Sequence, residues 1–230
     1  MLISEIFHSL QGEGSLSGVS SLFIRTAGCN LRCNWCDTPY SSWKPEGTMM
    51  TPEAFAERVI ASSAKHIVLT GGEPMIAPEV HLLANAIHSA GKHLTIETAA
   101  TIPPKNIACD LASLSPKLSN STPDDRLSPK WQEKHNDLRW QPDVVRAWIE
   151  AYPYQLKFVI CSPSDLEEVE TMLQELQCPI PPENVFLMPE GITTEALHEK
   201  ALWLANICQE RGYRYGYRLH IDLYGNTRGT

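Results

Sequence analysis

The sequence lacks any long hydrophobic run. No stretch approaches the roughly 20 consecutive apolar residues that a membrane-spanning helix needs, and the first residues show no basic segment followed by an apolar one. An excess of positive charge is missing too, since the formal net charge is -8 at pH 7. Nonspecific nucleic-acid binding depends on Lys and Arg neutralising phosphates. We therefore expect a cytoplasmic protein that acts on a small molecule and contacts neither a membrane nor nucleic acid.

A disulfide framework is also missing. The seven cysteines are an odd number, and three of them are bunched within eight residues. The four scattered ones are Cys109, Cys161, Cys178 and Cys208. They stand in apolar surroundings, where cysteine usually behaves as a small hydrophobic residue, and we predict that none of them binds iron. This usage favours a reducing compartment.

The composition is that of an ordinary globular protein. Of the 230 residues, 43% are hydrophobic and 20% are charged, and neither an internal repeat nor a low-complexity tract is present. A chain of this length can bury a substantial core in one domain. We expect a single domain over residues 1–230.

Apolar runs of strand length alternate with longer segments of helical period. This pattern is typical of parallel strands joined by crossover helices. The predicted strands cover Ser21–Thr26, His66–Leu69, His93–Glu97, Ile107–Leu111, Gln155–Val159, Val185–Met188 and Arg218–His220. The predicted helices cover Pro52–Ser62, Glu79–Ala90, Ser164–Leu176 and Thr194–Arg211.

The segment 118–152 breaks this alternation. It is rich in proline and contains three tryptophans, so we interpret it as an insertion within the domain. Short helices are predicted around Gln132–Arg139 and Asp143–Ala151. Four side chains near the second helix could share an apolar face: Trp140, Val144, Val145 and Trp148.

Polar and glycine-rich stretches follow four of the predicted strands. They are Gly28–Cys36, Thr70–Pro74, Thr98–Thr101 and Ser115–Lys117. In barrels and open parallel sheets, ligands bind beyond the carboxyl ends of the strands. We therefore expect one face of the sheet to collect the functional groups.

The most informative of these stretches contains Cys29, Cys33 and Cys36. Iron–sulfur cubanes are normally held by four thiolates, so three thiolates without an obvious fourth suggest a cluster whose last iron is open to a ligand. A zinc site is the alternative, because Cys33 and Cys36 have Cys-x-x-Cys spacing and His8 or another histidine could complete a tetrahedron. The sequence has no second Cys/His pair at recognisable spacing, which favours the cluster.

The pattern Cys-x-x-x-Cys-x-x-Cys, with Trp35 just before the last cysteine, resembles that of the radical S-adenosylmethionine (SAM) superfamily. Gly71-Gly72-Glu73-Pro74 resembles the GGEP motif of the same superfamily. This resemblance implies an α/β fold, an incomplete (β/α) barrel of the TIM type. It also implies a 4Fe-4S cluster on the three cysteines, with SAM on the open iron. Backbone carbonyls near the glycines and the carboxylate of Glu73 can accept charge-assisted hydrogen bonds, so this motif is expected to bind the methionyl amine.

Further motifs resemble a narrower family, the 7-carboxy-7-deazaguanine synthases. They are Glu5–Gly14, Phe23–Arg25, Trp35–Tyr40, Asp110–Lys117 and Leu219–His220, and together they span most of the chain apart from the insertion. The resemblance implies a radical SAM lyase that contracts the ring of 6-carboxy-5,6,7,8-tetrahydropterin with loss of ammonia, in queuosine or other 7-deazapurine biosynthesis. It also implies a homodimer and an electron donor such as flavodoxin or ferredoxin.

The same resemblance assigns residues to ligands. Thr38 is expected to help hold Mg²⁺, which prefers hard oxygen ligands. The residues expected at SAM are Trp35, Asp37, Gly72, Glu73, Glu97, Ser115, Pro116 and Lys117. The residues expected at the substrate are Leu10, Gln11, Gly12, Glu13, Arg25, Thr70 and His220. Their chemistry fits, because Gln11 can donate and accept on a pterin edge, Glu13 can accept from N–H groups, and Arg25 can bind a carboxylate.

One motif departs from the family. The family commonly shows Glu-Thr-Asn-Gly-Thr where this chain has Glu97-Thr98-Ala99-Ala100-Thr101, so a side-chain amide and a flexible glycine are missing. Two other functions stay open. A glycyl-radical-enzyme activase shares the cysteine pattern but gives no reason for Gln11, Glu13 and Arg25. A metal-bearing binding module would hold zinc, or a cluster that never cleaves SAM.

Overall fold

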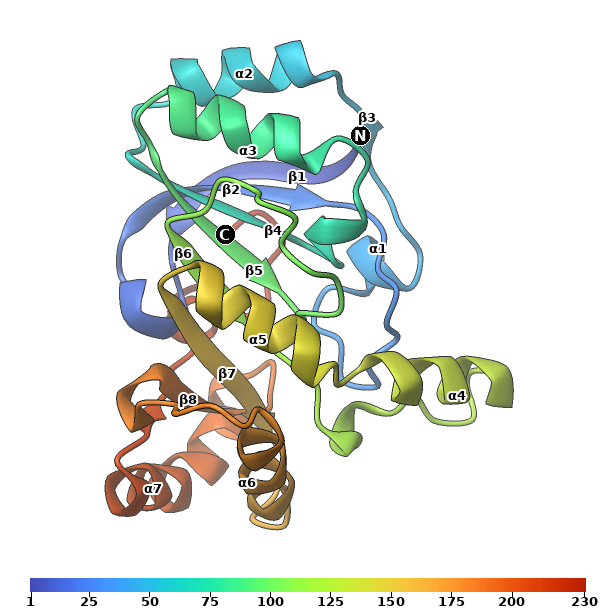
Figure 1. The fold of residues 1–230 in the computed structure, drawn as a ribbon, viewed down its shortest axis with the longest axis vertical. Coiled ribbons are helices and arrows are strands. Elements are labelled where there is room, and N and C mark those ends of the chain that lie inside the picture. The colour runs from blue at the N-terminus through green and yellow to red at the C-terminus, as the bar shows by residue number, and fades with distance from the viewer.

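The centre of the molecule is one open, mostly parallel sheet. A computed structural model describes all 230 residues, and its nine strands lie in the order β3-β1-β2-β4-β5-β6-β7-β8-β9 (Figure 1). The strands are β1 (Leu2–Leu10), β2 (Ser20–Thr26), β3 (Thr48–Met49), β4 (His66–Gly71), β5 (His93–Thr98), β6 (Leu111–Leu114), β7 (Tyr154–Ile160), β8 (Val185–Pro189) and β9 (Arg214–Tyr215). Neighbours from β2 through β9 are parallel, while β1 and β3 are antiparallel at one edge. The sheet does not close, which confirms the predicted incomplete barrel.

Most of the eight helices pack on one side of this sheet (Figure 1). They are α1 (Pro39–Ser42), α2 (Pro52–Ala61), α3 (Val80–Ser89), α4 (Pro129–Leu138), α5 (Pro142–Ala151), α6 (Asp165–Glu175), α7 (Thr194–Arg211) and α8 (Leu219–Tyr224). The start of α2 shows why these residues form a helix. The hydroxyl of Thr51 accepts from Ala54 N at 3.3 Å, and Pro52 occupies the first turn. None of the helices has both the length and the apolar character to cross a bilayer.

Most predicted elements are confirmed to within a few residues, but two strands are wrong. Residues 107–110 precede β6 instead of forming a strand, and Asp110 binds Leu94 partly through its side chain, because its carboxylate accepts from Leu94 N at 2.7 Å. Arg218 caps the short helix α8, in which Leu219 and His220 are the first residues. A helix of six residues is too short for hydrophobic periodicity to predict it. The antiparallel strand β1, which pairs with β2 along most of its length, was not predicted, nor were the two-residue strands β3 and β9.

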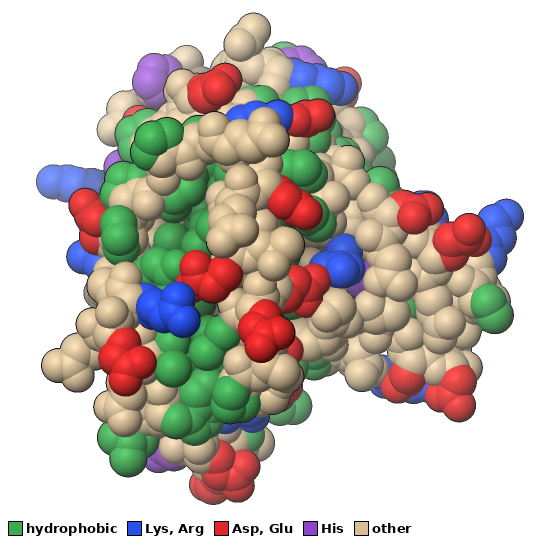
Figure 2. Space-filling view, turned by 60° about the horizontal axis from the view of Figure 1, so that its bottom comes forward, with side chains coloured by type: hydrophobic (Ala, Val, Ile, Leu, Met, Phe, Trp, Pro, Cys, Tyr) green, Lys and Arg blue, Asp and Glu red, His purple; other side chains and the backbone are tan.

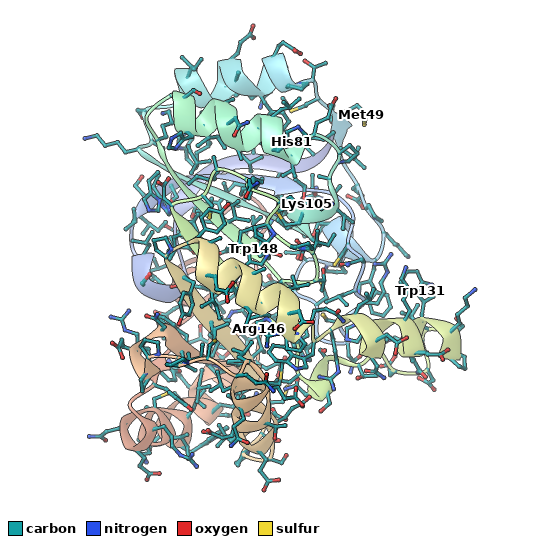
Figure 3. All side chains as sticks on the ribbon, viewed as in Figure 1. Met49, His81, Lys105, Trp131, Arg146 and Trp148 are labelled. Atoms are coloured by element: carbon teal, nitrogen blue, oxygen red, sulfur yellow. The ribbon has the colours of Figure 1, made fainter.

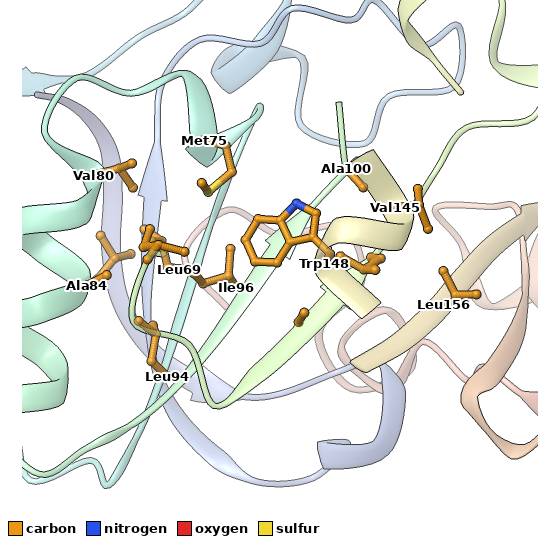
Figure 4. Close-up of a cluster of buried hydrophobic side chains, with 14 of the residues drawn as sticks. Leu69, Met75, Val80, Ala84, Leu94, Ile96, Ala100, Val145, Trp148 and Leu156 are labelled. Carbon is orange, nitrogen blue, oxygen red and sulfur yellow. The ribbon is translucent and has the colours of Figure 1, made fainter. Parts of the chain in front are cut away.

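The apolar core lies between the sheet and its helices. The link from β5 to β6 carries no helix, and α5, from the segment predicted as an insertion, contributes core side chains beside these strands (Figure 4). Trp148 is fully buried and donates to Ile102 O at 2.9 Å. Val145 is fully buried as well, and Trp140 and Val144 pack against the same cluster, which confirms the predicted apolar face. Figure 3 shows Trp148 over the sheet and Trp131 out on α4.

The helix α4 projects from the body as an arm with acidic and basic side chains interspersed (Figures 1 and 2). Its inner face braces the cysteine loop. Buried His135 accepts from Arg32 N at 3.1 Å through Nδ1, and its Nε2 bonds with Ser121 Oγ at 2.9 Å. Asn34 N donates to Ser121 O at 2.9 Å. Burial lowers the pKa of His135 to about 4, so the ring is neutral at pH 7. The segment 118–138 therefore helps to fix the loop that carries the three cysteines.

Candidate active site

The carboxyl ends of the parallel strands meet at one cleft. In the ladder, Arg25 stands beside Thr70 and Glu97 stands beside Ser113. The cleft contains about 1330 Å³ of empty space, part of it open solvent. The expected ligand-binding residues that line it are Leu10, Gln11, Gly12, Glu13, Arg25, Trp35, Asp37, Thr38, Thr70, Gly72, Glu97, Ser115, Lys117 and His220. The structure thus brings these side chains from separate segments to one cleft.

The cysteine loop lies between β2 and α1 and packs on the GGEP motif. Glu73 N donates to Gly28 O at 2.9 Å. At Gly72 the approach is closer still, because a Cβ there would lie 2.2 Å from Gly28 O and 2.8 Å from the Cβ of Cys29. Glycine is therefore required at this position by contact with a neighbouring backbone. The two sequence motifs, separated by residues 37–70, form one structural unit.

The three thiols are not gathered around one metal position, an arrangement that a 4Fe-4S cluster accepts. No group of three Cys, His, Asp or Glu side chains is arranged around a single metal position. In a cubane each thiolate binds a different iron, so closely converging sulfurs are not required. His8, proposed as a fourth zinc ligand, pairs with Leu22 near the start of β2 and lies 3.4 Å from Ser62 Oγ. It therefore points away from the cysteine loop, which follows the other end of that strand.

The thiols are held in a partly buried, protein-lined environment. Burial raises the pKa of Cys29 and of Cys33 to about 12, so without a bound metal both are neutral. Iron replaces such protons, because the thiolate is the ligand form. Cys36 Sγ also lies 3.1 Å from Ser42 Oγ. Of the other cysteines, Cys208 is buried in the core and contributes nothing to this loop.

Glu73 does not line the cleft. Its carboxylate is fully buried and accepts from Met75 N at 3.0 Å, from Thr98 Oγ1 at 2.8 Å and from Ala99 N at 2.8 Å. Burial raises the pKa of this carboxyl. The side chain thus ties the GGEP turn to the end of β5. Pro116 is likewise buried behind the cleft surface.

The departure from the family motif has a visible backbone consequence. Ala100 has a φ of 54°, in the left-handed region that favours glycine, and it is 1% exposed. Its N–H donates to Thr98 Oγ1 at 3.0 Å. The chain therefore keeps the turn that glycine would make, with alanine in the strained position.

A buried network of charges forms the floor of the cleft. Lys157 Nζ donates to Glu13 at 2.9 Å and to Glu97 at 3.4 Å. Arg218 Nε donates to the other oxygen of Glu13 at 3.1 Å, and its Nη2 donates to Asp37. Three carboxylates from separate segments are thus bridged by two cations.

This network fixes the charge states of the site. Burial alone would raise the pKa of Glu13 and of Asp37, but Arg218 beside both, and Lys157 beside Glu13, hold each below its usual range. Burial lowers the pKa of His220, whose ring lies against Gly12 so closely that a Cβ there would be 2.0 Å from its Nδ1. At neutral pH Glu13 and Asp37 are therefore ionised, and the imidazole of His220 is neutral.

The side-chain amide of Gln11 links residues expected at the substrate to Glu97, which is expected at SAM. Its Nε2 donates to Glu97 at 3.1 Å, and its Oε1 accepts from Glu13 N at 3.1 Å. Thr70 Oγ1 also donates to Glu97, at 3.3 Å. Glu97, expected at SAM, is therefore in direct contact with two residues expected at the substrate.

The residues expected near SAM and Mg²⁺ lie along one wall. Trp35 Nε1 donates to Asn120 O at 3.1 Å, and Lys117 Nζ lies 5.6 Å from the centre of the Trp35 ring. Lys117 also donates to Ser115 Oγ at 2.7 Å. Thr38 precedes α1, and its side chain makes no capping hydrogen bond to that helix.

Sequence reasoning missed two charged residues of the site, Lys157 and Arg218. A signal existed for Lys157, since a lysine inside an apolar strand is rarely buried unless it is paired. No local signal marked Arg218, because its partners Glu13 and Asp37 are distant in sequence. The C-terminal residues Gly225 to Thr230 were also not expected to line the cleft, although several of them do.

The fold and the cysteine loop define the class of protein. Residues 23–136 match the family model described as "Radical SAM superfamily". The structure resembles that of QueE from Escherichia coli with a TM-score of 0.66 and 24% identity, covering 95% of this chain and 94% of that one. This likeness concerns the fold alone. The match to the family model gives the class, and the protein is a radical SAM enzyme.

Comparison over the full sequence is more specific. The chain is 48% identical to a 7-carboxy-7-deazaguanine synthase of Rhodopirellula baltica, over 100% of this chain and 89% of the relative. It is 41% identical to one of Halobacterium salinarum, over 99% of this chain and 92% of the relative. The chain belongs to the 7-carboxy-7-deazaguanine synthase family.

Proposed function

We propose that this protein carries out the reaction of its family, the ring contraction of 6-carboxy-5,6,7,8-tetrahydropterin to 7-carboxy-7-deazaguanine with loss of ammonia. One observation carries the proposal. Gln11, Glu13 and Arg25 lie near the start of the sequence and His220 near its end, yet all four line the cleft that the cysteine loop borders. A glycyl-radical-enzyme activase would have no use for these groups.

Cys29, Cys33 and Cys36 are proposed to hold a 4Fe-4S cluster, and Trp35, Asp37, Gly72, Ser115 and Lys117 to contact SAM. When bound, the cluster and SAM supply the radical chemistry that starts the ring contraction. Glu73 supports this site from behind, because its carboxylate fixes the turn beside Gly72. The chain itself positions the reactants and keeps out competing ones.

The substrate is proposed to bind on the side of Leu10 to Glu13, where the geometry suits a pterin. Glu13, kept ionised by Lys157 and Arg218, accepts hydrogen bonds from ring N–H groups. Gln11 presents an amide beside it. Arg25 uses Nε for Glu5 at 2.8 Å, so its terminal nitrogens remain for the substrate carboxylate. Neutral His220 adds a ring nitrogen.

Further parts of the proposal rest on the family. Thr38 is proposed as a ligand of Mg²⁺, which would orient the substrate oxygens. We propose a single domain over residues 1–230 that works as a homodimer in the cytoplasm and receives its electron from a flavodoxin or ferredoxin. The product would enter queuosine or another 7-deazapurine pathway.

The test is an anaerobic assay with reconstituted cluster, reductant, SAM, Mg²⁺ and the carboxytetrahydropterin, with products identified by mass spectrometry. We expect 7-carboxy-7-deazaguanine from the wild type and none from Cys33→Ala. Omitting Mg²⁺ should lower the rate and leave SAM binding intact. SAM cleavage without ring contraction would show that the substrate is wrong, and an intact cluster with neither reaction would favour a binding module.

A further inference from the structure

Glu5 forms a junction beside the cleft. It stands opposite Arg25 in the β1–β2 ladder, and its Oε2 accepts from Arg25 Nε at 2.8 Å and from Tyr40 Oη at 2.9 Å. Its other oxygen accepts from Arg228 Nε at 2.9 Å. The Glu5 side chain is 9% exposed. One buried carboxylate thus joins β2, α1 and the end of the chain.

The last residues, 225–230, follow α8 and run along the cleft, where most of them form part of its lining. Their other side-chain hydrogen bonds are local, since Thr227 Oγ1 donates to Tyr224 O and Thr230 Oγ1 donates to Thr227 O. Arg228 alone ties this segment to the body through its side chain. Besides Glu5, it donates to Glu46 at 3.1 Å and lies 4.2 Å from the centre of the Tyr40 ring.

A short segment with this composition needs an anchor. Gly225 and Gly229 have φ values of 66° and 82°, and the segment is mostly exposed, so little else holds its conformation. A single exposed ion pair is weak. Arg228, however, combines two carboxylates and an aromatic face on one guanidinium.

The partners of Glu5 place its effect on the substrate side. Arg25 is the group proposed to bind the substrate carboxylate, and residues 225–230 follow His220, also proposed at the substrate. Trp35 and Lys117, proposed at SAM, make no contact with Glu5 or Arg228. A substitution at this junction should therefore weaken binding of the pterin and leave binding of SAM unchanged.

We propose, on the basis of the proposed function, that Glu5 and Arg228 are positioning residues for the substrate. Glu5 fixes the guanidinium of Arg25, and Arg228 holds residues 225–230 across the substrate side of the cleft through the same carboxylate. The end of the chain and the substrate-binding arginine then share one anchor.

Steady-state kinetics of Arg228→Gln and Arg228→Lys test this, with Arg211→Gln as the control. Arg211 is a comparable exposed arginine, 52% exposed and paired with Glu170 at 2.9 Å, on a helix away from the cleft. We expect Arg228→Gln to raise the KM for the pterin roughly three- to tenfold, as loss of an ion-pair network predicts. The KM for SAM and the unfolding temperature should not change. Arg228→Lys, which keeps the charge, should recover part of the loss.

A second measurement does not depend on turnover. Hydrogen exchange of residues 225–230, followed by mass spectrometry, should be faster in Arg228→Gln than in the wild type and unchanged in Arg211→Gln. Glu5→Gln should raise both the exchange rate and the pterin KM, since it weakens the hold on Arg25 as well. An unchanged pterin KM with unchanged exchange would overturn the proposal, as would equal losses in both arginine variants. If the wild type makes no product, the proposed function fails, while the exchange data still decide whether Arg228 anchors this segment.

Discussion

At the scale of single residues, the site depends on how closely backbones approach. Gly72 lets the GGEP turn touch the cysteine loop, with a Cβ-to-Gly28 O distance of 2.2 Å if a side chain were added. Gly28 O is a backbone atom, so it cannot move aside as the end of a flexible side chain could. The glycine is thus a packing requirement of the metal-binding loop.

We therefore predict that Gly72→Ala displaces the cysteine loop. Iron content after anaerobic reconstitution should fall well below that of the wild type, measured by iron analysis and by the cluster's absorbance. Gly91→Ala is the control, because a Cβ at Gly91 would meet nothing within 4 Å. It should lose some stability through its positive φ yet bind iron normally. Full iron content in Gly72→Ala would show that the loop tolerates the shift.

At Ala100, an unfavourable backbone conformation is offset by the burial of a methyl group. Its left-handed φ of 54° costs roughly 1 kcal/mol or more for alanine, while its buried methyl and the stiffer unfolded chain favour alanine by a similar amount. We predict that Ala100→Gly changes the free energy of unfolding by less than about 0.5 kcal/mol. Ala84→Gly, in the buried face of α3, should cost about 1 kcal/mol or more. Denaturant unfolding of both variants checks this; equal costs would mean that Ala100 is not strained.

At the scale of elements, β2, β4 and β5 are joined by one buried imidazole. His66 Nδ1 bonds with Ser21 Oγ at 2.6 Å, and its Nε2 bonds with Thr95 Oγ1 at 2.8 Å. Burial, assisted by the charge of His93, lowers the pKa of His66 from 6.5 to about 4. The ring is therefore neutral in the folded protein at pH 5 to 7.

This pKa shift predicts how stability depends on pH. Below pH 6.5 the unfolded chain binds a proton at His66 that the folded protein does not, so stability falls as the pH drops from 6.5 towards 4. The contribution is at most about 3 kcal/mol over that interval. Urea unfolding between pH 5 and 7.5 should show a smaller slope for His66→Gln than for the wild type or for His198→Gln, an exposed control. Equal slopes in all three would exclude this role for His66.

The insertion predicted at 118–152 shows what element-level prediction could and could not reach. The pattern located its helices and the apolar face of α5. It could not predict that α4 contacts the cysteine loop. The partners of His135 are Arg32 N and Ser121 Oγ, and every residue except proline has a backbone amide, so the sequence does not indicate which amide is bound. That contact exists only after the loop and the arm have folded together.

At the scale of the whole molecule, the charges beneath the cleft tie distant segments together. Lys157 on β7 meets Glu13 from the loop after β1 and Glu97 on β5, and its side chain is 3% exposed. Removing one member of a buried pair leaves the other charge without a partner, which is costly. The network therefore contributes to stability as well as to substrate binding.

We predict that Lys157→Met lowers the free energy of unfolding by about 3 kcal/mol. Glu13→Gln alone should cost less, and the double variant should be less destabilised than the sum of the two, because the stranded carboxylate is removed together with its cation. Denaturant unfolding of the four proteins in this cycle measures the coupling. Additive costs would mean that the two side chains do not interact energetically.

The sequence alone determined the chemistry of this protein and most of its architecture. The cysteine spacing and the GGEP motif are local patterns in the sequence. The alternation of strands and helices follows from hydrophobic periodicity, so the sequence predicts both the motifs and the elements. Only the tertiary structure decided which charges meet. Arg218 pairs with Glu13 and Asp37, the buried carboxylate of Glu73 accepts from Ala99 N, and Arg228 pairs with Glu5. These contacts join residues far apart in sequence, and their energy comes from burial and proximity that exist only in the folded chain.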